Sequence, residues 1–211
     1  MDLSRVCVML VRKMLPNIKI QIEIDQPFGE HYGCDPVSLP PLIYAEMLTQ
    51  QGLSIDAIAL RIQMGDAREG RGARDLMALS ALLDSYAVFE KPIAITALGA
   101  PSEPTPARDG EDRFEPGHWR KPWSPDAQSD WLQYALTVCL SKPYVHSVGW
   151  QELYDPPGAL ETLEMPHGGL ISKAGKAKPA LRHFSKATRL AAFRQPLAPR
   201  APNIEATALV E

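Results

Sequence analysis

The sequence predicts an α/β fold in which about four βα units form a partial (β/α) barrel, with parallel strands inside a layer of helices. Two observations support this fold class. Four short apolar segments have the length of buried strands, and stretches with helical hydrophobic spacing separate them. Because strands that alternate with helices form parallel sheets, the regular order favours the α/β class.

The first unit begins with a helical pattern and continues into a strand. Residues 3–15 carry apolar side chains at helical spacing, and Pro16 with Asn17 breaks this pattern. The apolar segment 18–24 is the first expected strand, and a polar turn region follows at 26–39.

The middle of the chain repeats this pattern twice. A helix that begins at Pro40 and ends near Gly52 leads to an expected strand at 57–63. After a charged, glycine-rich loop, a second helix leads to a third strand at 92–96. The apolar face of that second helix is expected to consist of Leu76, Leu79, Leu82, Leu83 and Tyr86.

The last unit follows a long proline-rich and aromatic loop over 99–122. Ser124 and Pro125 form a strong helix start, because a hydroxyl cap precedes a proline at the first helical position. The fourth strand is expected at 145–150, and a final helix begins near Pro179.

Composition describes one globular domain. The 211 residues are 45% hydrophobic and 22% charged, which suits a sizeable core. We expect the domain to cover 1–194 and the proline-rich tail, 195–211, to be flexible.

Charge excludes several classes of partner. The net charge of -3 is scattered along the chain, so we expect no nucleic-acid binding and no membrane anchor. The apolar N-terminal stretch is too short and too charged to span a bilayer, and it has no signal-peptide cleavage site. The default expectation is therefore cytoplasmic, although the localisation stays unknown because the true N-terminus could lie upstream.

Cysteine and histidine spacing indicates neither a metal site nor a cofactor. Cys7, Cys34 and Cys139 are far apart and lack the spacing of a zinc or redox motif, so we expect buried, reduced thiols. His31 and His118 have no serine, cysteine or metal-ligand partner at a telling spacing.

Four βα units amount to half of an eight-stranded barrel. In such barrels the loops that follow the strands form the active-site face. The two edge strands of a half-barrel expose unpaired backbone groups, so the chain is expected to need a homodimer partner or a missing N-terminal half-barrel.

Several segments, in order, resemble the last four strands of family 10 glycoside hydrolases, the endo-1,4-β-xylanase TIM barrels. They are QPFGEH (26–31), IDAIALRIQMG (55–65), KPIAITALGAPS (91–102), HWRKPWSPDAQSDWL (118–132), VGWQELYD (148–155) and GGLISKAGKAKPA (168–180). The resemblance implies a glycoside hydrolase homologue that acts on or binds a β-linked, xylan-like oligosaccharide.

The catalytic carboxylates of that family are not intact in this chain. Retaining hydrolysis needs two carboxyl groups, one as acid/base and one as nucleophile. In the resembled family the acid/base follows the fourth strand, which would precede Met1, and the nucleophile ends an I-T-E pattern. Here the pattern is Ile95-Thr96-Ala97. Because a methyl group cannot attack an anomeric carbon, we expect impaired catalysis, and whether the chain is an enzyme stays uncertain.

Four residues are candidates for sugar binding. The resemblance implies that Trp150 forms the floor of the sugar site, while a plain core role stays open. Arg61 and Gln63 stand where the family has glutamine and histidine, and Arg61 could pair with a carboxylate or be a solvated strand-end residue. Trp119 could stack on sugars at the rim or, like Trp123, fix the long loop to the barrel.

Two other carboxylates are weak candidates for replacing the lost nucleophile. Glu30 and Glu152 fall in loops on the expected active-site face, and each could equally be a solvated loop charge. Three hypotheses follow: a catalytically impaired hydrolase homologue, a non-catalytic carbohydrate-binding protein, and a truncated half-barrel that self-associates.

Overall fold

The computed structural model describes residues 2–29, 37–66, 70–105, 115–157 and 165–192. The expected tail at 195–211 lies outside these residues, as do Glu30, His31 and Cys34.

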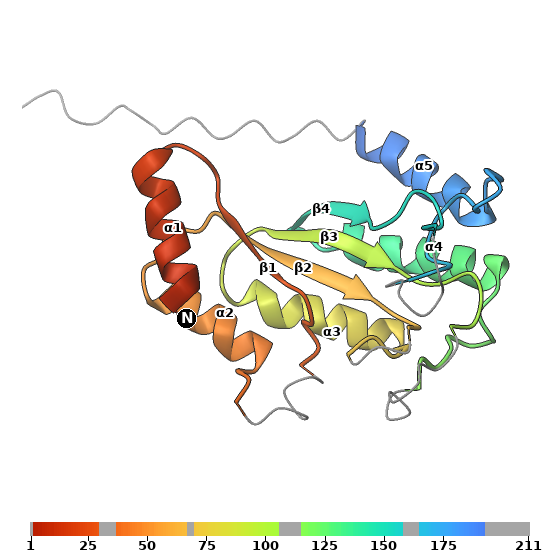
Figure 1. Ribbon diagram of the computed structural model, residues 1–211, viewed down its shortest axis with the longest axis horizontal. Helices are drawn as coiled ribbons and strands as arrows, with labels where there is room; N and C mark the ends of the chain where they lie inside the picture. The colour runs from red at the N-terminus through yellow and green to blue at the C-terminus, as the bar shows by residue number, and fades with distance from the viewer. Residues whose placement is uncertain (1, 30–36, 67–69, 106–114, 158–164, 193–211) are drawn as a thin grey trace, which may run out of the picture.

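Four parallel strands form one sheet in the order in which they occur in the chain (Figure 1). They are β1 (Gln21–Ile24), β2 (Ala57–Gln63), β3 (Ile93–Gly99) and β4 (Val145–Trp150). The helices between and around them are α1 (Asp2–Met14), α2 (Pro41–Gln50), α3 (Leu76–Ala87), α4 (Pro125–Ser141) and α5 (Pro179–Ala192). The predicted alternation of strands and helices is confirmed.

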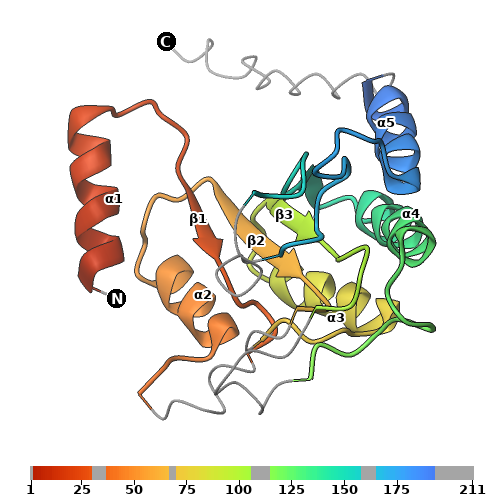
Figure 2. The same cartoon turned by 45° about the vertical axis from the view of Figure 1, so that its right-hand side comes forward.

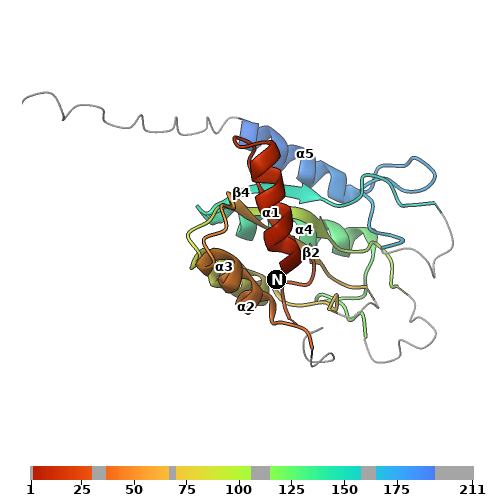
Figure 3. The same ribbon diagram turned by 60° about the vertical axis from the view of Figure 1, so that its left-hand side comes forward.

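The helices follow one another around the sheet as part of a ring. In Figure 2 they run from α1 through α2, α3 and α4 to α5 on the outer side of the strands. Figure 3, seen from the side of α1, shows α2 and α3 together on one side of the sheet. This arrangement is a partial (β/α) barrel, as predicted.

Helix starts were predictable because they depend on local hydrogen bonds. The Ser124 side chain accepts a hydrogen bond from the Ala127 amide at 3.1 Å, and Pro125 occupies the first helical position. Asp75 caps α3 in the same way, since its Oδ1 accepts from the Ala78 amide at 2.7 Å.

Two strand boundaries differ from the prediction. Strand β1 begins at Gln21, because the Asp56 side chain accepts from the Ile20 amide at 2.8 Å and the Asp56 amide donates to the Ile20 carbonyl at 2.7 Å. These local bonds replace ladder pairing before Gln21. Strand β3 continues past Thr96 to Gly99, because its residues stay paired with β2.

The core lies between the sheet and the helices. On α3 the predicted apolar face is buried at four positions, Leu79, Leu82, Leu83 and Tyr86. It packs with side chains of β2 and β3 in one hydrophobic cluster. Burial of this kind raises the pKa of the Cys139 thiol on α4 to about 12.

Helix α1 contradicts the expectation of buried thiols. Cys7 is exposed, as are Leu3, Leu10 and Met14 on the same helix, whereas Val8 is buried.

Within the ranges given above, no helix is long and apolar enough to cross a membrane.

Candidate functional site

The carboxyl-terminal ends of the four strands define the candidate site, because barrels of this type hold their active sites there. Successive side chains along a strand point to opposite faces of the sheet. On β2, Ile58, Leu60 and Ile62 belong to the core beneath the helices. Arg61 and Gln63 therefore lie on the opposite face, which we term the inner face.

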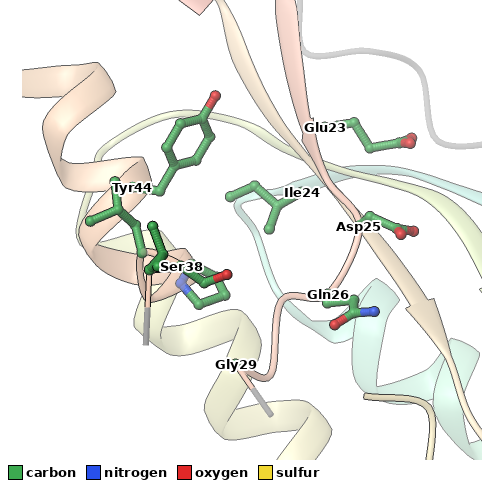
Figure 4. Close-up of a pocket in the computed structure, with 10 residues that line it drawn as sticks. Glu23, Ile24, Asp25, Gln26, Gly29, Ser38 and Tyr44 are labelled. Atoms are coloured by element: carbon green, nitrogen blue, oxygen red, sulfur yellow. The ribbon is translucent and has the colours of Figure 1, made fainter. Parts of the chain in front are cut away.

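Strand β1 brings two acidic residues to the inner face that the sequence analysis did not single out. Figure 4 shows Glu23 and Asp25 on one side of β1 and Ile24 on the side of α2. Glu23 Oε2 accepts a hydrogen bond from Oγ1 of Thr96 on β3. The alternation of polar and apolar residues over 21–25 is the signal that could have identified them.

A pocket of about 450 Å³ adjoins this end of β1 (Figure 4). Glu23 and Asp25 line it together with Tyr44 of α2. Trp150 is not part of this pocket, because it ends β4 at the far side of the strand order. The candidate residues thus lie at opposite edges of the sheet, Glu23 and Asp25 at the β1 edge and Trp150 at the β4 edge.

Ala97 lies inside β3, rather than at its end, and pairs in register with Arg61. The register shifts just before this pair, so Thr96 forms a bulge between the paired residues Ile95 and Ala97. The side chain at position 97 is a methyl group that is only 8% exposed. It offers neither a nucleophile nor a hydrogen bond.

Arg61 pairs with a carboxylate, which is one of the two alternatives left open by its sequence. Its Nε lies 3.4 Å from Oδ1 of Asp25. Arg71 extends the network, with Nη2 at 3.7 Å from the same Asp25 oxygen and Nη1 at 3.8 Å from Oδ2 of the buried Asp66. These charges hold the loop after β2 against the end of β1.

Gln63 carries the most conspicuous polar group of the inner face. It is only 4% exposed, and neither atom of its side-chain amide has a hydrogen-bond partner in the described part of the chain. Gln63 pairs in register with Gly99 of β3. Met165 packs closely against this glycine, because a Cβ there would lie 3.2 Å from the Met165 sulfur. A buried amide costs about 1–3 kcal/mol when unpaired, so this group is suited to a ligand that both donates and accepts.

Trp150 is fixed by two neighbours. Its Nε1 donates to the carbonyl of Gly168 at 2.9 Å, and its ring meets Trp131 edge to face at 6.3 Å between centroids. The residue is only half-buried, so part of its ring stays accessible. Trp150 also pairs in register with the core residue Leu98 and packs against the core cluster, so these contacts favour the packing interpretation.

A buried ammonium group holds the segment that carries Gly168. Lys178 Nζ donates to Asp155 Oδ1 at 2.6 Å, to Ser102 Oγ at 2.8 Å and to the His167 carbonyl at 3.2 Å. The same Asp155 oxygen accepts from the Gly169 amide at 2.9 Å. Asp155 therefore has a structural role, and the loops after β3 and β4 are joined here.

The two tryptophans of the long loop lie away from the inner face. Trp119 is 6% exposed and packs against Arg120 and Tyr134 of α4, so little of its ring is left for a sugar. Trp123 is also buried, and its Nε1 lies 2.5 Å from where a Cβ on Gly65 would be. Gly65 has a φ of +80°, so glycine is required there on both counts. This packing supports the loop-fixing interpretation.

The remaining candidates add little chemistry. Glu152 is half-buried just past Trp150, and Glu30 lies outside the described residues. His118 is exposed on the outer side, beside Trp119 and the start of α3. Among the residues that the structure describes, no group of three or more His, Cys, Asp and Glu side chains could hold a metal ion.

Comparisons with known proteins identify the fold. No protein-family model and no curated protein sequence matches this chain. Xylanase 10B from Thermotoga petrophila, solved with xylobiose, matches with a TM-score of 0.62 at 12% identity, over 90% of this chain and 52% of that one. A thermostable mutant of a xylanase from Cellvibrio japonicus matches with a TM-score of 0.63 at 13% identity, over 89% and 54%.

A third match is the intracellular xylanase from Thermoanaerobacterium saccharolyticum in complex with xylotetraose. Its TM-score is 0.58 at 14% identity, over 87% of this chain and 49% of that one. The chain thus spans about half the length of these xylanases. The protein has the fold of a partial (β/α)8 barrel. In particular, this partial barrel is like that of the family 10 xylanases, which confirms the predicted resemblance in fold.

Proposed function

We propose that this protein is a carbohydrate-binding homologue of xylanase barrels that cannot hydrolyse its sugar by the retaining mechanism. The observation that carries the proposal is the inner face itself. It combines the unpaired amide of Gln63 with acidic groups and has only a methyl group at position 97, and the half-buried Trp150 ends β4 at the same end of the sheet. Hydroxyl-rich ligands suit such a face, because their hydroxyls both donate and accept hydrogen bonds, and the accessible part of the Trp150 ring at the strand end is proposed to cover an apolar sugar face.

The solved neighbours support the choice of ligand. Those with bound oligosaccharides carry xylobiose, xylotetraose, xylopentaose or xylohexaose. We therefore choose a β-1,4-linked xylo-oligosaccharide as the ligand class for this chain. Its open sheet edges, β1 and β4, are proposed to be covered by a second half-barrel, either another copy or a separate N-terminal half.

Calorimetric titration with xylotetraose tests the binding. We expect the wild-type chain to bind, and Trp150→Ala to weaken binding by about tenfold or more, because a buried aromatic contact dominates such sites. The matched control is Trp119→Ala, which removes a tryptophan that packs against α4. No heat of binding at millimolar xylotetraose would contradict the proposal.

Hydrolysis is tested separately with xylan and an aryl xyloside. We expect no turnover above the buffer rate, because Ala97 can neither form a glycosyl-enzyme intermediate nor balance an oxocarbenium charge. Substantial turnover that follows the purified chain through two chromatographic steps would show that the retaining mechanism, or a substitute for it, is present.

A further inference from the structure

A carboxylate from β1 reaches across the sheet to β3. Glu23 pairs in register with Ala59 of β2, and its carboxylate accepts a hydrogen bond from Thr96, one strand further on. Neighbouring strands lie about 4.8 Å apart, so an extended glutamate is needed to cover this distance. Ala59 is fully buried and carries only a methyl group, which leaves the path across β2 open.

The bulge in β3 determines where this carboxylate is held. Thr96 has no register partner on β2, because Ile95 pairs with Leu60 and Ala97 pairs with Arg61. Bulges redirect a side chain locally, and here the threonine hydroxyl meets Glu23. The carboxylate of Glu23 therefore lies beside Thr96, the residue before Ala97. Strand β3 itself has no acidic side chain there.

Two independent features of the inner face support ligand binding. The Gln63 amide, 4% exposed and without a partner among the described residues, lies on the same face of β2 as Ala59. Glu23 itself is exposed and lines the pocket at the end of β1. An acceptor and an unpaired amide thus share one face of the sheet.

We propose that Glu23, rather than residue 97, supplies the carboxylate of this part of the inner face and accepts hydrogen bonds from the hydroxyl groups of a bound sugar. A carboxylate has two oxygens and accepts several hydrogen bonds, so the bond from Thr96 leaves acceptor positions for a ligand. Charge-assisted bonds of this kind are stronger than neutral ones and make Glu23 a determinant of affinity. The inference rests on the proposed carbohydrate binding.

The test is a titration of three variants with xylotetraose. Glu23→Gln keeps the shape but replaces one acceptor by a donor, and it is expected to weaken binding by about tenfold or more. Thr96→Val removes the hydroxyl that holds the carboxylate and is expected to weaken binding less. In the double variant Thr96→Val should add nothing, because its effect acts through Glu23. Glu46→Gln on α2 is the matched control and should bind like the wild type.

The outcomes separate this inference from the proposed function. If the wild-type chain binds xylotetraose and Glu23→Gln binds it equally well, the role of Glu23 is refuted while carbohydrate binding stands. If the wild-type chain does not bind, the proposed function fails first. Thermal melting checks the fold of each variant. Should Glu23→Gln not fold, Thr96→Val decides alone, and unchanged binding would overturn the inference.

Discussion

Lys178 shows how one residue supports the geometry of the strand ends. Its ammonium group is buried and bonds to Asp155, Ser102 and the carbonyl of His167, and so joins the segments that follow β3 and β4. The Gly168 carbonyl, which fixes the Trp150 indole, lies next to this cluster. Lys178 therefore supports the position of the Trp150 ring indirectly.

Replacing Lys178 by methionine should destabilise the fold strongly. The variant leaves Asp155, whose side chain is 6% exposed, as a buried charge without its partner. Breaking a buried pair in this way costs about 3–5 kcal/mol in the free energy of unfolding. Urea unfolding measures the loss, and Lys176→Met, at an exposed position of the same segment, serves as the control. A loss below about 1 kcal/mol would mean that water reaches Asp155.

At the residue scale, the sequence singled out Ala97, where the resembled family has its nucleophile, but not the nearby Glu23. Ala97 was identified through its place in a resembled motif. Glu23 in β1 and Asp25 directly after it belong to no segment that resembles a catalytic motif, and their side-chain direction follows only from alternation. The contact between Glu23 and Thr96 depends on the bulge in β3 and on the small side chain of Ala59. The sequence alone predicts neither effect, because both follow from the register of the strands.

Single carboxylates connect the elements of the outer layer. Asp84 of α3 accepts hydrogen bonds from Lys142 Nζ at 2.7 and 2.8 Å and from the Tyr144 hydroxyl, which together connect α3 to the turn before β4. The bond from Lys142, followed by that from Tyr144, lowers the pKa of Asp84. Asp56 has a lowered pKa mainly through the Ile20 amide, and then through Arg12 of α1.

These shifts predict a loss of stability in acid. A carboxyl with a lowered pKa in the folded state contributes stability above its unfolded pKa, about 3.9, and that contribution disappears as the pH falls through the folded pKa. We expect Asp84→Asn to melt below the wild type at pH 7 and to approach it below about pH 4. Melting curves from pH 7 to 2 measure this, with Glu115→Gln as an exposed control. Parallel curves at all pH values would contradict the assignment to Asp84.

Helix starts were predictable because their sequence signals are local. Strand boundaries were less predictable because they depend on pairing with neighbouring strands. The hydroxyl cap and proline at Ser124 and Pro125 placed the start of α4 correctly. The start of β1 and the end of β3 depend on the neighbours Asp56 and β2, so the apolar pattern alone misplaced both. The apolar spacing of α1 predicted a helix, but it could not tell which surface covers that helix.

The described residues form a section of a barrel whose sheet is open at both edges. The strand order runs from β1 to β4, so these two strands have a neighbour on one side only among the described residues. Parallel sheets are normally covered on both faces and closed or protected at their edges. Helix α1, which lies beside β1 in Figure 2, exposes four large apolar residues, Leu3, Val6, Leu10 and Met14. The open edges of β1 and β4 and the exposed apolar residues of α1 favour association with a second half-barrel over an isolated half-barrel.

A second copy would cover these surfaces by placing its β4 edge against β1, in parallel, and its own β1 edge against β4. Such a two-fold arrangement closes eight strands and leaves no free edge. Sedimentation equilibrium should therefore find dimers, and Leu10→Lys, at a side chain that is 55% exposed, should shift them to monomers. Met77→Lys on α3, where the side chain is 76% exposed, should leave the mass unchanged. A concentration-independent monomer with a cooperative melt would exclude the second copy and leave a separate N-terminal half as the partner to test by co-expression.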